Sequence, residues 1–179
     1  EIMSGDWSSD VCSSDLWSIY NDFDQYSPAQ NEGGQLNGGQ AWYWTQFYLE
    51  EDASLVSVHL LFDGVYMNAQ VYINGQVLGY YPNGYTPFSY DITPYLRNDG
   101  TANQLAVFVE NQQPSSRWYS GSGIYREVKL LITDSVHLDL YGIKIESPKL
   151  KEQRDGWVET QLESKVSNDG SQSVSVYLE

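Results

Sequence analysis

The sequence has little cysteine, histidine or positive charge. Cys12 is its single cysteine, so no disulfide can form within the chain and the redox compartment is undetermined. His59 and His137 are its only histidines, and they form no metal-ligand spacing and give little support to a histidine-based triad. Nine Lys and Arg stand against 24 Asp and Glu, a net charge of −15 that repels phosphate backbones and anionic lipids. We therefore expect no nucleic-acid partner and no membrane partner.

Long apolar runs and nucleotide-binding motifs are also missing. No stretch reaches the roughly 20 apolar residues of a transmembrane helix, and no basic region followed by an apolar one opens the chain. A P-loop and a dinucleotide fingerprint are absent, and Gly121-Ser122-Gly123 is not a nucleophile elbow. Localisation therefore stays open between a cytoplasmic and an exported protein.

Aromatic residues are abundant instead, at 15 % of the chain, with 15 Tyr and 6 Trp. Flat rings pack on the apolar faces of sugars, while amides and hydroxyls bond the edges. A chain rich in Tyr, Trp, Asn, Gly and Ser thus suits polyhydroxylated ligands. The same composition also fits the ordinary filling of a β-sandwich, and composition does not separate the two interpretations.

Short β-favouring segments follow one another from residue 41. Alternation in residues 55–62 predicts one buried face, with His59 on the exposed one. Asn74-Gly75 predicts a tight hairpin, and Thr93-Pro94 predicts an N-cap and one helical turn. The expected strands of this part of the chain are 42–49, 55–62, 69–73, 76–80, 105–109 and 128–132.

Composition divides the chain into regions. Residues 1–16 lack strand or helix periodicity and are similar to the conceptual translation of a sequencing-library adapter, so we interpret them as an artefact or else as a disordered tail. Residues 17–134 are predicted to form a sandwich whose segment 17–40 is a glycine-rich surface loop. Residues 135–179, with expected strands at 136–140, 158–166 and 174–178, are predicted to begin a second, incomplete sandwich.

One connection is far longer than a hairpin needs. Between the strands at 105–109 and 128–132, a simple hairpin would take two to five residues. The intervening segment instead carries Arg117, Trp118 and Tyr119. Long loops with aromatic and charged tips on a β scaffold often bind ligands, although these rings would equally cap an open end of the core.

Carboxylates are numerous enough to include a glycosidase pair by type alone. Asp63, Asp91 and Glu32 are candidates of this kind. Asp63-Gly64 and Asp91-Ile92-Thr93 also stand where Asp commonly caps turns, and that interpretation is the better supported one. No complete active site is specified.

Four blocks, in order, carry a resemblance to family 2 glycoside hydrolases of the bacterial β-galactosidase branch. They are Trp17 to Gly34, Phe62 to Gly75, Gly79 to Leu96 and Ser116 to Arg126, the last similar to the family's RWYxGxGIYR loop. The resemblance implies an all-β chain, with a jelly-roll (galactose-binding-like) sandwich followed by a truncated immunoglobulin-like sandwich. It further implies a (β/α)8 barrel beyond this chain, which carries the acid/base and nucleophile glutamates.

The implied function is that of an N-terminal, non-catalytic fragment of a retaining β-galactosidase, inactive by itself. The alternatives are a free-standing carbohydrate-binding module, and a β-glucuronidase or β-mannosidase of the same family. The resemblance implies a β-galactoside sugar, the missing barrel and a homo-oligomer as partners. It implies no cofactor in this chain, and Mg or Na in the full-length enzyme.

The family's sandwich lends a loop to the barrel's active site. By motif position, the expected sugar-binding residues are Arg117, Trp118, Tyr119 and Ser116, with Asn31 and Glu32 at the rim. The Arg117 guanidinium would donate hydrogen bonds to sugar hydroxyls. Ser116 stands where some relatives carry an Asp that contacts sodium, and no metal ligand or catalytic residue is predicted here.

Overall fold

The computed structural model describes residues 2–4, 15–50, 52, 55–115, 121–152 and 156–177. Within them the chain is all-β with four short 3-10 helices, and no helix there is long and apolar enough to cross a membrane. The prediction of an all-β chain is confirmed. The elements, in order, are β1 (Ile2–Ser4), β2 (Asp15–Leu16), η1 (Trp17–Tyr20), η2 (Gln30–Gly33), β3 (Gly39–Phe47), β4 (Val56–Phe62), β5 (Val65–Tyr66), β6 (Ala69–Ile73), β7 (Gln76–Tyr81), β8 (Phe88–Asp91), η3 (Thr93–Tyr95), β9 (Asn103–Asn111), β10 (Gly123–Ile124), β11 (Val128–Asp134), β12 (Val136–Glu146), η4 (Leu150–Glu152) and β13 (Gln161–Asn168).

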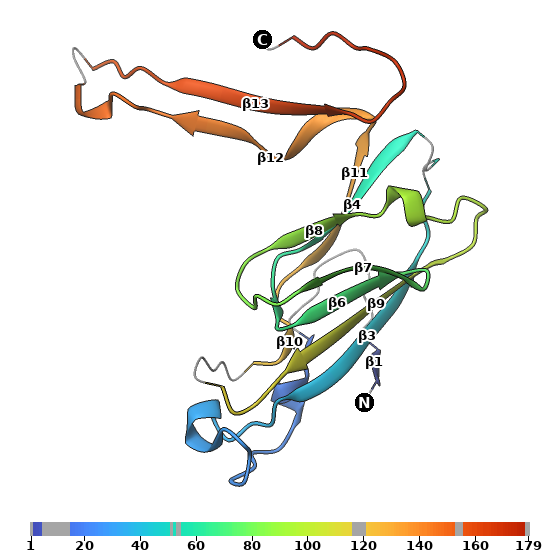
Figure 1. Ribbon diagram of the computed structural model, residues 1–179, viewed down its shortest axis with the longest axis vertical. Coiled ribbons are helices and arrows are strands. Elements are labelled where there is room, and N and C mark those ends of the chain that lie inside the picture. Colours follow the sequence, from blue (N-terminus) through green and yellow to red (C-terminus); the bar gives the residue numbers. More distant parts are fainter. Residues whose placement is uncertain are drawn as a thin grey trace.

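Two sheets enclose the core. One has the strand order β1-β3-β9-β6-β7 and the other the order β11-β4-β8, while β2-β10-β5 form a small third sheet (Figure 1). Alternate residues of β3, β9 and β6 face inward and meet residues of β4 and β8, where Phe62 and Phe88 stack at 4.8 Å between ring centroids. This two-layer arrangement is the predicted sandwich.

β4 is buried more completely than its alternation predicts. Ser57 and Leu61 are buried together with the expected Val58, Leu60 and Phe62. The reason is position, because β4 is the central strand between β11 and β8. His59 is half-buried rather than exposed, since its ring lies 6.3 Å from that of His137 on β12.

The two turn predictions had different outcomes. Asn74 and Gly75 join β6 to β7 with φ of 49° and 82°, the left-handed values that a type I′ hairpin turn needs at both positions. The short helix at Thr93–Tyr95 is confirmed as well. Thr93 is not its N-cap, because the cap position is Ile92 and the Thr93 hydroxyl accepts a hydrogen bond from Val58 N at 2.8 Å.

The last part of the chain is a single long hairpin. Among the described strands, β12 and β13 pair with each other and with no third one. Their register shifts between Leu138 and Ile143, where Tyr141 has φ of 58°. Figure 1 shows this hairpin at one end of the molecule and residues 17–38 at the other. The predicted strand at 174–178 is wrong, because residues 173–177 form no strand and Leu178 lies outside the described residues.

Residues 17–38 are more ordered than a surface loop. Trp17, Ser18, Ser27 and Ala29 are buried in this segment. Backbone hydrogen bonds cross it, including Asp24 N to Gln35 O at 2.7 Å. The boundary predicted between residues 16 and 17 stays a prediction; β2, at residues 15–16, pairs with β10.

Candidate functional site

The predicted binding loop is described only at its two ends. Ser116, Arg117, Trp118 and Tyr119 lie outside the described residues, so their predicted roles stay predictions. The described ends, residues 111–115 and 121–126, leave β9 and return through β10. They therefore show where on the sandwich the loop is attached.

A buried polar network joins the two ends to each other and to the start of the sandwich. Asn111 Nδ2 donates to Ser122 Oγ at 2.6 Å, and Ser122 N donates to Ser18 Oγ at 3.1 Å. Trp17 N donates to Ser122 O at 3.0 Å. All three polar side chains are buried, so each of these bonds forms away from competing water. The network fixes both ends of the loop relative to η1.

A second contact ties the outgoing end to residues 33–38. The Gln113 side-chain oxygen accepts a hydrogen bond from Gly38 N at 2.9 Å. A Cβ on Gly38 would lie 2.4 Å from Asn111 O and 2.9 Å from Gln113 Cγ, so only glycine permits this approach. Segments 75 residues apart in sequence thus meet at the base of the loop.

A cavity of about 570 Å³ lies at this junction. Its lining combines Pro28, residues 37–40 and residues 110–114. The side chains include Gln40, Gln112 and the Glu110 carboxylate, which accepts a hydrogen bond from Gln40 Nε2 at 2.7 Å. Amides offer donors and acceptors together, which is the requirement for pairing with sugar hydroxyls. The cavity is therefore suited to a neutral polyhydroxylated ligand.

A second hollow of about 630 Å³ is lined by residues 21–26 with Gln35 and Asn37. Asn37 lines both hollows and donates to Asp24 Oδ2 at 3.1 Å. The backbone N–H of Tyr26, followed by the Asn37 amide, holds the pKa of Asp24 below its ordinary value. Asp24 therefore stays ionised here and organises this part of the segment.

The two rim candidates, Asn31 and Glu32, lie in η2 with exposed side chains. Asn31 Oδ1 accepts a hydrogen bond from Gln35 Nε2 at 3.1 Å. Neither residue lines the two hollows described above. η2 nevertheless packs beside the loop base, because a Cβ on Gly33 would lie 3.5 Å from Gln113 Nε2.

The other carboxylates have structural partners. Asp63 forms an ion pair with Lys129 at 2.9 Å, and Asp91 Oδ1 accepts a hydrogen bond from Thr93 N at 2.9 Å as a turn cap. The Asp91 contact agrees with the turn interpretation, whereas the Asp63 contact joins it to a residue of β11 rather than capping its turn. In the part of the chain that the structure describes, no three His, Cys, Asp or Glu residues are grouped to hold a metal ion.

The incoming end of the loop is supported by tyrosines. Tyr125 hydroxyl donates to Gly84 O at 2.8 Å, and Gly84 lies so close to the Tyr66 ring that a Cβ there would be 2.2 Å from it. Burial, followed by the hydrogen bond with Tyr85, raises the pKa of Tyr66 to about 12. The aromatic segment around residue 84 thus supports residues 123–125.

Sequence reasoning missed most of the loop base. Asn111, Ser122 and Ser18 are small polar residues with no motif that marks them as partners. Gln113 lies inside the long connection at residues 111–126, but nothing in the sequence indicates its contact with Gly38. A cluster of glycines at 33–39 facing a long connection was the available signal.

The family described as "Glycosyl hydrolases family 2, sugar binding domain" matches residues 15–134. Beta-galactosidase BoGH2A of Bacteroides ovatus is 45 % identical over 139 residues, which are 77 % of this chain and 16 % of that protein. A putative beta-glucuronidase of Formosa agariphila is 41 % identical over 123 residues, 68 % of this chain and 12 % of that protein.

A solved glycosidase structure is also similar to this chain over a part of its length. A beta-glycosidase from Bacteroides vulgatus matches with a TM-score of 0.78 and 34 % identity, over 90 % of this chain and 20 % of that one. The chain thus spans a fifth or less of the length of these three relatives.

Proposed function

Because the chain belongs to family 2 of the glycosyl hydrolases, we propose that it forms the sugar-binding part of a retaining β-galactosidase. The observation that carries this proposal is the 45 % identity with a relative named as a β-galactosidase. The reaction needs two carboxyl groups about 5–5.5 Å apart, one a nucleophile and one an acid/base. In this proposal a barrel outside the chain supplies both groups.

The contribution of this chain is substrate positioning. The network of Asn111, Ser122 and Ser18 supports the proposal, because a loop with fixed ends can hold its tip against a separate catalytic domain. Arg117 then donates hydrogen bonds to sugar hydroxyls, Trp118 packs near the sugar face, and Tyr119 and Ser116 complete the pocket. Asn31 and Glu32 stand at the rim.

A β-glucuronidase is the second candidate, because a relative with 41 % identity carries that name as putative. A uronate carboxylate needs a cation, and the described lining of the 570 Å³ cavity holds no Lys or Arg. Under this alternative Arg117 would pair with the carboxylate through its planar guanidinium. A free-standing carbohydrate-binding module remains the third candidate.

The deciding experiment uses the full-length parent enzyme with paired chromogenic β-D-galactoside and β-D-glucuronide substrates. We expect kcat/KM to be at least tenfold higher for the galactoside. The reverse ratio would replace the proposal with the glucuronidase, and turnover of neither substrate, nor of a chromogenic β-D-mannoside, would favour the binding module. The 179-residue chain alone is expected to hydrolyse neither substrate.

Arg117→Ala tests the loop in the same enzyme. We expect kcat/KM for the galactoside to fall at least tenfold with little change in Tm, because the guanidinium acts on substrate rather than on the core. Arg97→Ala is the matched control, since the Arg97 guanidinium bonds only to the nearby Ala102 O at 3.0 Å among its described side-chain contacts. Equal kcat/KM in the two variants would remove the role assigned to Arg117.

A further inference from the structure

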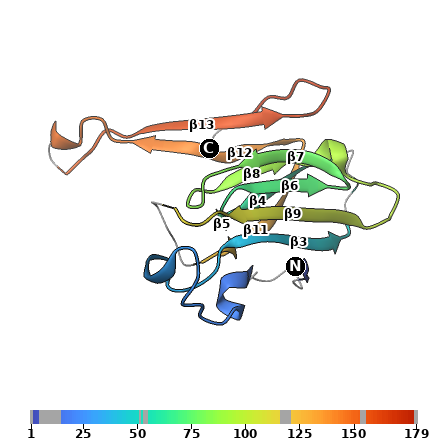
Figure 2. The same ribbon diagram turned by 60° about the horizontal axis from the view of Figure 1, so that its bottom comes forward.

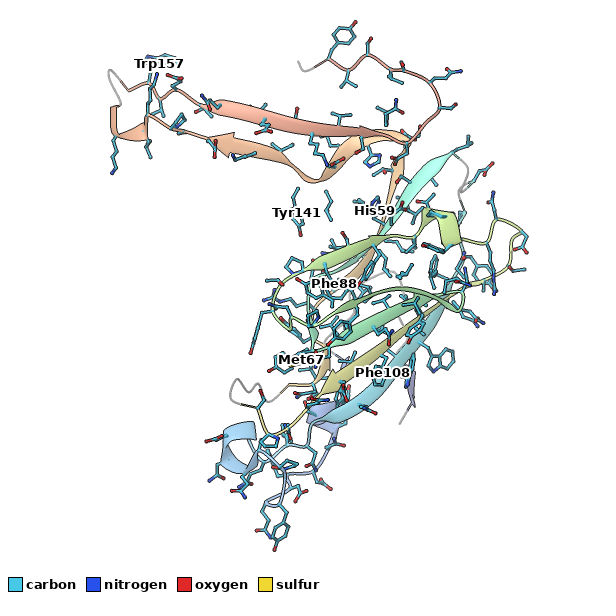
Figure 3. All side chains as sticks on the ribbon, viewed as in Figure 1. His59, Met67, Phe88, Phe108, Tyr141 and Trp157 are labelled. Carbon is cyan, nitrogen blue, oxygen red and sulfur yellow. The ribbon has the colours of Figure 1, made fainter. Side chains whose placement is uncertain are left out.

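The outward face of the larger sheet is lined by aromatic rings. In β3, Ala41 and Tyr43 point into the core, so Trp42 and Trp44 point away from it, with 39 % and 44 % of their surfaces exposed. Phe108 of β9 and Tyr72 of β6 are half-buried on the same side. We call Trp42, Trp44, Tyr72 and Phe108 the outer aromatic face; Figure 3 labels Phe108 on this sheet.

Strand register brings these rings together from three strands. Trp42 pairs with Phe108, which pairs in turn with Gln70, while Trp44 and Tyr72 both pair with Ala106 in the next row. The Trp42 ring lies 5.1 Å from that of Phe108 and 5.4 Å from that of Tyr72. Figure 2 shows β3, β9 and β6 side by side. With strands about 4.8 Å apart, the three strands span about 10 Å, which is wide enough for more than one sugar ring.

Amides border the rings along the strands. Gln40 and Glu110 form the row before Trp42, and Gln46 and Gln104 form the row after Trp44. Aromatic centres with amide edges match the apolar faces and hydroxyl rims of pyranose sugars.

The face is almost uncharged, although the chain has a net charge of −15. Glu110 is the single charged residue within β3, β6, β7 and β9, and Gln40 Nε2 donates a hydrogen bond to its carboxylate. A uronic acid polymer would meet this carboxylate without a cation to offset it. The electrostatics therefore favour a neutral glycan.

The face is also continuous with the candidate site. Gln40 and Glu110 line the 570 Å³ cavity and form the first row of the face as well. A glycan that lies across Trp42 and Phe108 would thus extend toward the base of the loop at residues 111–122. Continuity of this kind is not required for stability of the sandwich, whose core lies on the other side of the sheet.

We propose that the outer aromatic face binds a neutral oligosaccharide, as a surface site distinct from the pocket that receives the sugar to be hydrolysed. Binding here needs no catalytic glutamate and does not depend on which glycoside the parent enzyme cleaves. The rings of Trp42 and Phe108 stack on the sugar faces, and the Gln40 and Gln70 amides bond hydroxyls.

Isothermal titration calorimetry of the 179-residue chain tests this proposal. The neutral probes are β-1,4-linked galactohexaose and cellohexaose, and the acidic probe is a β-1,4-linked hexaglucuronate, which matches cellohexaose in linkage and length. We expect a neutral probe to bind at least tenfold more tightly than the acidic one, and Trp42→Ala to weaken that binding at least tenfold. Trp157→Ala is the matched control, because Trp157 is 83 % exposed and lies on the distant hairpin (Figure 3).

Several outcomes would overturn the proposal. They are binding of neither neutral probe, tighter binding of the hexaglucuronate than of cellohexaose, and equal losses from Trp42→Ala and Trp157→Ala. Concentration-dependent dimerisation that Trp42→Ala abolishes would assign the face to a protein interface instead. Trp42→Phe keeps an aromatic ring and should bind the neutral probe nearly as tightly as the parent chain does, a comparison that stands even if the alanine variant unfolds. Failure here leaves the galactosidase assay unaffected, since that assay uses single-sugar substrates.

Discussion

The sandwich and the β12–β13 hairpin use the same kind of strand in opposite ways. In the sandwich, inward residues of two sheets cover each other, and Phe62, Val71 and Val107 are fully buried. In the hairpin, Leu138, Ile145 and Leu162 alternate just as clearly, yet all three are exposed. No described residue in 135–151 or 156–177 is buried. Alternation thus creates an apolar face, but only a facing layer turns that face into a core.

The polar contacts differ in the same way. The sandwich buries Asn111 and Ser122 in a network that joins distant segments. The hairpin relies on surface pairs such as Lys149 with Glu159 at 2.8 Å, and Asp139 with Lys165. Exposed pairs of this type contribute little stability, because water competes for both charges. A two-stranded hairpin is at best marginally stable on its own.

The largest expected effect comes from breaking the sandwich core. Phe62→Ala should lower the free energy of unfolding by about 3–5 kcal/mol, because it removes a fully buried ring that stacks on Phe88. Ile145→Ala in the hairpin should change it by no more than about 0.5 kcal/mol, since that side chain is 66 % exposed. Urea unfolding followed by tryptophan fluorescence measures both. Similar losses in the two variants would mean that the hairpin is packed in solution.

A smaller effect is expected from the loop base. Asn111→Ala should cost about 1–3 kcal/mol, because Ser122 Oγ loses its buried partner. Cleavage between residues 112 and 122 by a nonspecific protease should accelerate at the same time. Asn31→Ala is the control, since its hydrogen bond with Gln35 is exposed. If the two variants are equally stable and equally resistant, the network does not hold the loop.

The smallest expected effect is the change in thermal stability with pH that the Asp24 carboxyl causes. Its pKa is lowered in the folded chain, so its contribution to stability is complete above its ordinary value of 3.8 and is lost as the pH falls through the folded-state pKa. The Asp24→Asn variant should therefore have a lower Tm than the parent chain at about pH 6, and this difference in Tm should be smaller at about pH 3. Thermal melts at both pH values measure this. A constant difference in Tm would exclude a contribution from ionisation of this carboxyl.

Most elements of the sandwich could be predicted from local pattern. The alternation in 69–73 and 105–109 and the Asn74-Gly75 turn each produced the expected strand or turn. Predictions were wrong where the local structure depended on contact with another segment of the folded chain. Thr93 bonds to Val58 rather than capping its helix, and residues 173–177 have no described strand beside them to pair with.

The candidate site was predictable only as a segment. Its length and its Arg-Trp-Tyr tip distinguish residues 111–126 from an ordinary turn, and the family resemblance assigns it a role. Its base was not predictable, because Gln113 meets Gly38 across 75 residues, and Ser122 meets Ser18 across 104 residues. No local periodicity reports contacts at such a separation.

An all-β chain, the Asn74-Gly75 turn and membership of the family 2 glycosyl hydrolases were all predictable from the sequence. Those properties follow from residue period, from backbone preference at single positions and from ordered motifs. The position of β9 between β3 and β6 is a property of the folded sheet, and it places Trp42, Phe108 and Tyr72 on one surface. Strand order decides which rings meet, because rings on separate strands touch only after the sheet has formed.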